Sequence, residues 1–212
     1  MVRHLASDAR CSELALLCRK KLPEWDSMEA ESATFKDKVR YLEFENFDDL
    51  ATKVSGHETS LDGYDAFFCT LGTRTKVGEE LFKKVDYQYP LDFARIGLAK
   101  SVKYYGLLSS TGASASSMFL YMRTKGEVER DVKALDLLHL SIFQPGLLTN
   151  RDNDHRIGEA ILSWFPITKI EAKDCGKGMI ENAIRKLSGA EDTAKVVTLS
   201  NGDLRNLSSG KM

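Results

Sequence analysis

Short apolar runs alternate with amphipathic stretches along most of this chain. Runs of mainly apolar residues predict strands at Leu14–Cys18, 39–44, 64–71, 102–108, 140–143 and 195–199. Apolar residues recur three or four positions apart over 79–99, which predicts an amphipathic helix, and further helices are expected over 48–54, 118–138 and 174–187. Strands that alternate with helices are typical of a parallel sheet covered by helices, so we predict an α/β fold.

Proline, glycine and polar residues indicate where these elements break. Pro90 stands inside the helix predicted over 79–99, and because proline lacks a backbone N–H we expect a kink or a break there. Asp174 is predicted to cap the last helix and Gly189 to end it. The polar residues 23–37 are predicted to form a loop.

Composition narrows the class of protein. The 212 residues, 42% hydrophobic and 29% charged, can bury a full core. The 30 basic and 31 acidic side chains give a net charge of -1, which offers no bulk electrostatic case for binding nucleic acid or an anionic membrane. No apolar run approaches the roughly 20 residues that span a bilayer, and the opening residues lack the apolar segment of a signal peptide.

The cysteines and histidines do not suggest a metal centre. Cys11, Cys18, Cys69 and Cys175 share no ligand spacing, and the histidines are scattered. Buried or inert thiols in a reducing compartment are the simpler reading. We therefore expect a cytoplasmic protein without membrane insertion, with the nucleus as a second compartment.

Three side chains suggest acid/base chemistry. Tyr121 and Lys125 are spaced to share one face of the helix predicted over 118–138, with Cβ atoms about 6 Å apart. An ammonium so close stabilises a phenolate, and this lowers the pKa of a tyrosine from its usual value of about 10. Ser109 follows the strand predicted over 102–108, so its hydroxyl can hold the oxygen that exchanges a proton with Tyr121. An ordinary exposed Tyr–Lys pair is the alternative, and the spacing alone does not exclude it.

The order of several motifs resembles that of atypical or extended short-chain dehydrogenases. These motifs are Leu107-Leu-Ser-Ser-Thr-Gly-Ala113, Tyr121-x-x-x-Lys125-Gly-Glu-Val-Glu129, Phe143-x-Pro-Gly-x-Leu148 and Cys69-Thr-Leu-Gly-Thr-Arg74. Within that class the chain is most similar to the Tat-interacting oxidoreductase family, known in animals as tumour-suppressor proteins. The resemblance implies a single Rossmann-like domain over 1–212, with a nucleotide-binding core in 1–150 and a small substrate region in 151–212.

The same resemblance implies roles in catalysis and in binding NADP(H). Tyr121 would donate or accept the proton, Lys125 would also contact the nicotinamide ribose, and Ser109 would position the substrate. The remaining cofactor-binding positions follow from the family motifs. They are Arg19, Lys20, Leu71, Gly72, Leu148 and Arg156.

Among these, Arg19 and Lys20 would distinguish NADP from NAD, because a dianionic 2′-phosphate favours paired cations. A solvated turn is the alternative for Arg19, Lys20 and Lys21. Trp164 and Phe165 are expected to line the substrate site or to belong to the core. The substrate itself is a small molecule that the sequence does not name.

Two departures from the family pattern stand out. Asp86 occupies the position where many relatives in the wider superfamily carry an asparagine, which could weaken a proton relay, although the most similar family shares the aspartate. The first glycine is Gly56, so the family's opening strand and its glycine-rich phosphate loop are not found, and Met1–Asp8 resembles the end of the helix that follows that loop. We therefore expect this chain to bind NADP weakly and to fold poorly.

Three functions stay open at this point. The first is an NADP-dependent oxidoreductase that acts on a carbonyl or an alcohol. The second, which the resemblance implies, is a nucleotide-sensing regulator with little turnover that binds a nuclear transport receptor or a transcription partner. Phe119, Leu120 and the polar C-terminal tail would then be its contact surface. The third is a non-functional product. A homodimer through the helices predicted over 79–99 and 118–138 is also possible.

Overall fold

Four of the apolar runs pair into one parallel sheet. The computed structural model describes residues 1–150, 168–189 and 194–211. In it, β3 (Ala66–Cys69), β4 (Tyr104–Leu108), β5 (Leu140–Gln144) and β8 (Val196–Ser200) lie in the order β3-β4-β5-β8, and all neighbours are parallel. The strands β4 and β5 are central and almost wholly buried. The predicted α/β fold with a parallel sheet is thereby confirmed.

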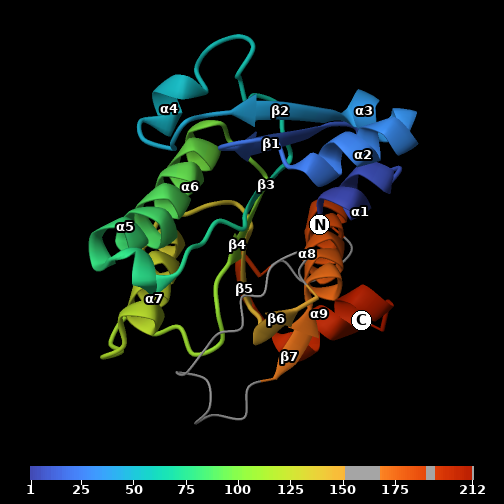
Figure 1. Ribbon diagram of the computed structural model, residues 1–212. Helices are drawn as coiled ribbons and strands as arrows, with labels where there is room; N and C mark the ends of the chain where they lie inside the picture. The colour runs from blue at the N-terminus through green and yellow to red at the C-terminus, as the bar shows by residue number, and fades with distance from the viewer. Residues whose placement is uncertain (151–167, 190–193, 212) are drawn as a thin grey trace. The chain divides into compact units, whose positions relative to one another are not determined.

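Helices cover both faces of this sheet (Figure 1). One face carries α5 (Glu79–Lys83), α6 (Tyr89–Ala99) and α7 (Leu120–Lys133), and the other carries α8 (Ala172–Ser188). Neighbouring residues of β4 point to opposite faces, as the strand period requires. The Tyr105 hydroxyl donates to the carbonyl of Pro90 at 2.8 Å, whereas the Tyr104 hydroxyl donates to Asn182 Oδ1 of α8 at 2.9 Å.

The break expected at Pro90 takes the form of a π-turn. Residues Lys84–Gln88 form one turn of π-helix between α5 and α6, and Pro90 stands in the first turn of α6. A proline ring inside an α-helix clashes with the carbonyl four residues earlier, here that of Asp86, and a wider turn relieves such a clash. The turn leaves Asp86 with only 1% of its surface exposed.

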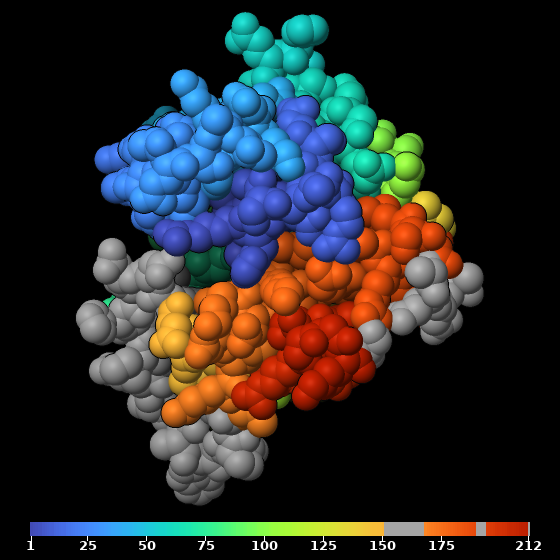
Figure 2. Space-filling view, turned by 90° about the vertical axis from the view of Figure 1, so that its right-hand side faces the viewer, coloured from blue at the N-terminus to red at the C-terminus, as the bar shows by residue number. Residues whose placement is uncertain are grey.

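The C-terminal part contains elements that the sequence did not predict. Short strands β6 (Leu147–Thr149) and β7 (Lys169–Glu171) pair in parallel, and α9 (Asn201–Ser209) replaces the polar tail. A capping box between Ser200 and Asp203 starts α9, which buries Leu204 and Leu207. In Figure 2 this helix, in red, lies against α8, in orange. The sequence pattern therefore missed this helix, while the contact role expected of the tail stays a prediction.

The ends of α8 agree only in part with the prediction. Gly189 ends the helix in a left-handed conformation with φ 67°, as expected. Asp174 lies in the first turn and is not the cap, because the helix begins earlier, after Glu171. An acidic residue in that turn still interacts favourably with the helix dipole.

A further 3-10 turn, η1, covers Thr75–Val77.

The first 61 residues form a separate compact unit, Met1–Leu61, and Asp62–Met212 form the other. In the first unit β1 (Leu14–Cys18) pairs in parallel with β2 (Val39–Glu43). The helices of this unit are α1 (Val2–Ser7), α2 (Pro23–Glu31), α3 (Ala33–Lys38) and α4 (Leu50–Lys53). The expected division at residue 150 stays a prediction.

The loop predicted over 23–37 is wrong, since α2 and α3 occupy it. Pro23 starts α2, and Glu24 and Asp26 lie in its first turn, where acidic residues suit the helix dipole. No residue of α2 is buried, so the helix lacks the apolar stripe by which a sequence pattern reveals a helix. Its support comes from Trp25, which stacks on Tyr41 with ring centroids 5.4 Å apart.

Candidate active site around helix α7

A buried ion pair lies between the π-turn and α7. Lys125 Nζ lies 2.8 Å from Asp86 Oδ1, and the two side chains are 7% and 1% exposed. The backbone N–H of Thr73, just beyond β3, donates to Asp86 Oδ2 at 2.7 Å. Burial alone would lower the pKa of Lys125, but the Asp86 carboxylate outweighs it and raises that pKa above its ordinary value. The lysine is therefore held as an ammonium, in one place.

Gly72 brings the backbone after β3 against this pair. A Cβ atom at position 72 would lie 3.2 Å from Asp86 Oδ1 and 3.8 Å from Lys125 Nζ. Position 72 is nevertheless exposed, so its backbone faces solvent on one side and the ion pair on the other. Leu71, at the same turn, is partly exposed. The predicted cofactor positions Leu71 and Gly72 thus lie beside the predicted catalytic lysine.

Tyr121 stands at the start of α7, one turn before Lys125. The helix begins at Leu120 after an extended Phe119, whose N–H donates to Ser117 Oγ at 3.2 Å. The Tyr121 ring packs against Phe82 of α5, with centroids 6.0 Å apart. The phenol is partly exposed, and it lies four residues before Lys125 on the same helix. The shared helix face predicted for the two residues is therefore present.

Ser109 follows β4 directly, and its side chain points to α7. The residue is 6% exposed, and its backbone N–H donates to the carbonyl of Phe143 at 2.7 Å. Its hydroxyl donates to Glu129 Oε1. The loop after it returns to the helix, where the N–H of Ser114 donates to the carbonyl of Met122 at 3.0 Å. The structure thus brings Ser109 to the helix that carries the tyrosine and the lysine.

Glu129 is a site residue that the sequence reasoning passed over. It lies on α7 one turn beyond Lys125, is 5% exposed, and accepts hydrogen bonds from Ser109 and Gln144. Such a residue does leave a signal in the sequence: polar residues at 121, 125 and 129 recur every four positions on one helix face. A buried polar stripe on a helix indicates a polar site rather than ordinary core packing.

Of the other predicted positions in the second unit, one lies in β6 and three lie outside the described residues. Leu148 lies in β6, partly exposed, after the Pro145-Gly146 turn. Arg156, Trp164 and Phe165 fall within residues 151–167, which lie outside the described part of the chain. Within the described ranges no cluster of histidine, cysteine and carboxylate side chains could hold a metal ion.

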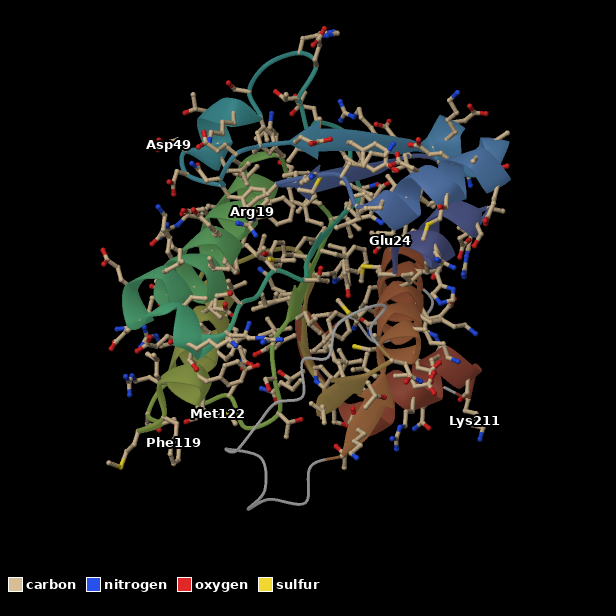
Figure 3. All side chains as sticks on the ribbon, in the orientation of Figure 1. Arg19, Glu24, Asp49, Phe119, Met122 and Lys211 are labelled. Carbon is tan, nitrogen blue, oxygen red and sulfur yellow. The ribbon has the colours of Figure 1, made fainter. Side chains whose placement is uncertain are left out.

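The basic turn after β1, residues 19–21, belongs to the first unit, and its three cations differ in whether they contact other side chains. Lys21 pairs with Asp26 at 2.8 Å and with Glu29 at 2.7 Å, and it lies over the ring of Tyr41. Hydrogen bonding to Asp26 and Glu29 raises the pKa of Lys21. Arg19 and Lys20 are exposed, and among the described residues their side chains have no hydrogen-bond or ion-pair partner. Figure 3 shows Arg19 just beyond the end of β1.

Solved structures with the same fold define the class of protein. A Bacillus halodurans protein assigned as an NAD-dependent epimerase/dehydratase matches with a TM-score of 0.63 and 17% identity, over 99% of this chain and 94% of that one. The UDP-glucuronic acid 4-epimerase of Bacillus cereus, solved with NAD, matches with a TM-score of 0.60 and 9% identity, over 93% and 73%. The chain therefore has the Rossmann-like fold of such enzymes.

Curated relatives narrow the class to one family. Protein HTATIP2 of Rattus norvegicus is 38% identical over 155 residues, which cover 73% of this chain and 59% of the rat protein. Protein FMP52, mitochondrial, of Candida albicans is 35% identical over 188 residues, covering 82% and 81%. No protein-family model matches the chain. The chain belongs to the HTATIP2 and FMP52 family, an atypical branch of the short-chain dehydrogenases, and the predicted resemblance is confirmed.

In the described part of the chain, no helix is long and apolar enough to cross a membrane.

Proposed function

We propose that this protein is an NADP-dependent oxidoreductase of the short-chain dehydrogenase type, which transfers a hydride to or from a carbonyl or an alcohol. The observation that carries this proposal is the group on α7. Tyr121 and Lys125 share one face, a buried carboxylate holds the lysine 2.8 Å away, and Ser109 reaches the same helix from the end of β4. Ligands of parallel α/β sheets bind at the carboxyl ends of the strands, where Ser109 and Gly72 lie.

Each side chain has a distinct task in this proposal. Tyr121 gives a proton to the substrate oxygen or takes one from it, and Ser109 contacts the same oxygen. Lys125, fixed by Asp86, presents its positive charge on the helix face that carries Tyr121, and we propose that it contacts a ribose hydroxyl. The nicotinamide of the cofactor supplies or takes up the hydride when it is bound.

The residues present fit a dinucleotide. The exposed backbone at Gly72 allows a ligand to approach closely, since no side chain stands there. Leu71, Leu148 and Arg156 are proposed to complete the contacts to the nicotinamide and phosphate end. Two solved structures of the same fold, MoeE5 and the Bacillus cereus epimerase, are complexes with NAD, which supports a nicotinamide dinucleotide.

We propose NADP rather than NAD because of the turn after β1. Arg19 and Lys20 are exposed cations without a protein partner among the described residues, whereas Lys21 is already engaged by two carboxylates. A site for a free ribose hydroxyl normally presents a carboxylate at such a turn, and a site for a 2′-phosphate presents cations. The two unpaired cations therefore favour the phosphorylated cofactor.

A thermal-shift titration with NADPH and with NADH tests this function. A ligand that binds only the folded state, at 100 times its dissociation constant, stabilises it by about 2.7 kcal/mol. We expect a larger shift with NADPH than with NADH, and expect the Arg19→Ala, Lys20→Ala double variant to lose the difference. Lys36→Ala, on the exposed end of α3, is the matched control. If neither cofactor raises the melting temperature, the proposed function is wrong.

A second function is favoured by exposed apolar side chains beside the site. Met118 and Phe119, just before α7, are 93% and 60% exposed. Such a pair suits contact with another protein, so a cofactor-sensing regulator that binds a nuclear transport receptor, or a homodimer, is the alternative. Tyr121→Phe separates the two functions. An effect in cells that survives this substitution, yet needs bound dinucleotide, would favour the regulator.

The compartment is also a proposal. The sequence predicts a cytoplasmic protein with the nucleus as a second compartment, whereas the FMP52 relatives are named as mitochondrial. Fractionation of cells that express a tagged full-length protein distinguishes the three compartments.

A further inference from the structure

The basic turn after β1 leads directly into an acidic helix. Residues 19–31 hold three cations and four carboxylates, and all four carboxylates belong to α2. A turn proposed to hold a dianionic phosphate is therefore followed, within the same unit, by a helix of net negative charge. Carboxylates near a bound phosphate weaken its binding by like-charge repulsion unless a cation offsets their charge.

Lys21 contacts two of these carboxylates at once. Its Nζ lies 2.8 Å from Asp26 Oδ1 and donates to Glu29 Oε2 at 2.7 Å. Asp26 and Glu29 are three residues apart, so they share one face of α2. Hydrogen bonding to Lys21 lowers the pKa of Glu29, so this carboxyl group stays charged at neutral pH. One ammonium thus offsets the charge of both carboxylates that contact the basic turn.

The ammonium of Lys21 is held from a second side by aromatic rings. Nζ lies 4.5 Å from the centroid of the Tyr41 ring on β2, and Trp25 of α2 stacks on that ring. The face of an aromatic ring attracts a cation. Contacts with β2 and α2 thus fix Lys21, whereas Arg19 and Lys20 are exposed and contact no partner among the described residues.

We infer that Lys21 is a positioning residue for cofactor specificity: it holds Asp26 and Glu29 and offsets their charge, so that Arg19 and Lys20 bind a 2′-phosphate beside an acidic helix. The inference rests on the proposed function, because it concerns the turn proposed to select NADP over NAD. Lys21 contacts no cofactor atom in this role and acts through the two carboxylates. Its loss should weaken the binding of NADPH more than that of NADH, since only NADPH carries the additional phosphate.

Fluorescence titrations of the protein with NADPH and with NADH test this inference. The ratio of the two dissociation constants measures the preference for the 2′-phosphate. In Lys21→Met this preference should fall roughly threefold at low salt, within the range that exposed charge pairs produce. The fall should become smaller as salt is added, because salt screens charges at the surface. Lys21→Arg keeps the cation and should keep the preference.

Removing the carboxylates distinguishes this role from direct contact and from a purely structural role. Lys21→Met combined with Asp26→Asn and Glu29→Gln leaves no charge to offset, so the preference for NADPH should return at least to its wild-type value. A lysine that bound the phosphate itself, or that only supported α2, could not be replaced by removing two acids. Lys36→Met, at the exposed end of α3, is the matched control and should leave both dissociation constants unchanged.

The outcomes separate a failure of this inference from a failure of the proposed function. If NADPH does not bind the wild-type protein, or binds no more tightly than NADH, the proposed cofactor is wrong and the inference fails with it. Given a wild-type preference for NADPH, two results overturn the inference alone: an unchanged preference in Lys21→Met, or a loss that the triple variant does not restore.

A second variant decides the matter should Lys21→Met fail to fold. Asp26→Asn with Glu29→Gln, in a protein that keeps Lys21, removes the two negative charges and releases the ammonium. A stronger preference for NADPH in this double variant supports the inference, and an equal or weaker preference overturns it.

Discussion

Gly126 is the position in α7 where adding a single methyl group should destabilise the protein most. It follows Lys125 on the buried side of the helix, and the loop after Ser109 rests directly on it. An ideal Cβ atom at 126 would lie 2.1 Å from the backbone nitrogen of Ala115 and 2.2 Å from the carbonyl carbon of Ser114. Both atoms belong to the backbone, so no flexible side chain can swing away. Gly126→Ala must therefore push the loop off the helix.

Two opposing terms decide the size of the effect. Replacing a glycine by alanine inside a helix stabilises by about 1 kcal/mol, because the unfolded chain loses freedom. Overpacking against fixed backbone costs about 3 kcal/mol. Displacing the loop also threatens the hydrogen bond from the Ser114 N–H to the Met122 carbonyl. We expect a net loss of about 2 kcal/mol, which corresponds to a fall of roughly 4–8 °C in melting temperature for a protein of this size.

Thermal melts and urea unfolding of the wild type and of Gly126→Ala measure this loss. Gly202→Ala is the matched control, since Gly202 lies in α9 and its Cβ would meet only Ser200 Oγ, at an ordinary 3.6 Å. The control should be neutral or slightly stabilising. A Gly126→Ala protein as stable as the control would show that the loop does not rest on α7, and the placement of Ser109 would fail with it.

Three further predictions concern the buried ion pair, the last helix and a buried thiol. Asp86→Leu leaves the Lys125 ammonium buried without its carboxylate and should lower the free energy of unfolding by about 3–5 kcal/mol, measured in urea. Adding Lys125→Met should recover much of this loss. A loss as large in the double variant would argue against the ion pair. Ser200→Ala removes the capping box of α9 and should cost about 1 kcal/mol, with Ser209→Ala, at the other end of the helix, as an inert comparison. Burial raises the pKa of the Cys69 thiol, so this thiol ionises at a lower pH in the unfolded chain than in the folded protein. The folded protein therefore loses stability as the pH rises above the ordinary thiol pKa of about 8.5. Cys69→Ala should lessen that alkaline loss when the free energy of unfolding is measured from neutral to alkaline pH. An unchanged alkaline slope in Cys69→Ala would contradict the burial of this thiol.

The central elements of the fold were predictable because their signals are local. The strands β4 and β5 are continuous apolar runs, and such runs become strands that are buried on both faces. Pro90 predicted the break between α5 and α6, since the lack of an N–H acts on the helix that contains it. Gly189 predicted the end of α8 for a similar reason, as only glycine takes a left-handed conformation without strain.

Elements that depend on distant partners were missed. The helix α2 has no buried face, so its pattern resembles a loop, and its contacts with Lys21 and Tyr41 come from outside the helix. The strands β6 and β7 are three residues each, too short for a periodicity to show. The helix α9 had a readable start in Ser200 and Asp203, but it buries Leu204 against Gly178, which no local pattern reveals.

The sequence by itself determined the pairing of Tyr121 with Lys125, because four residues along a helix always return to the same face. It also determined that Ser109 ends a strand and that Arg19 and Lys20 follow one. Only the tertiary structure decided which groups these side chains meet. Asp86 reaches Lys125 through a π-turn, and Ser109 gives its hydrogen to Glu129 twenty residues further on. Contacts between elements depend on how the helices pack on the sheet, and the spacing of residues along one element does not reveal that packing.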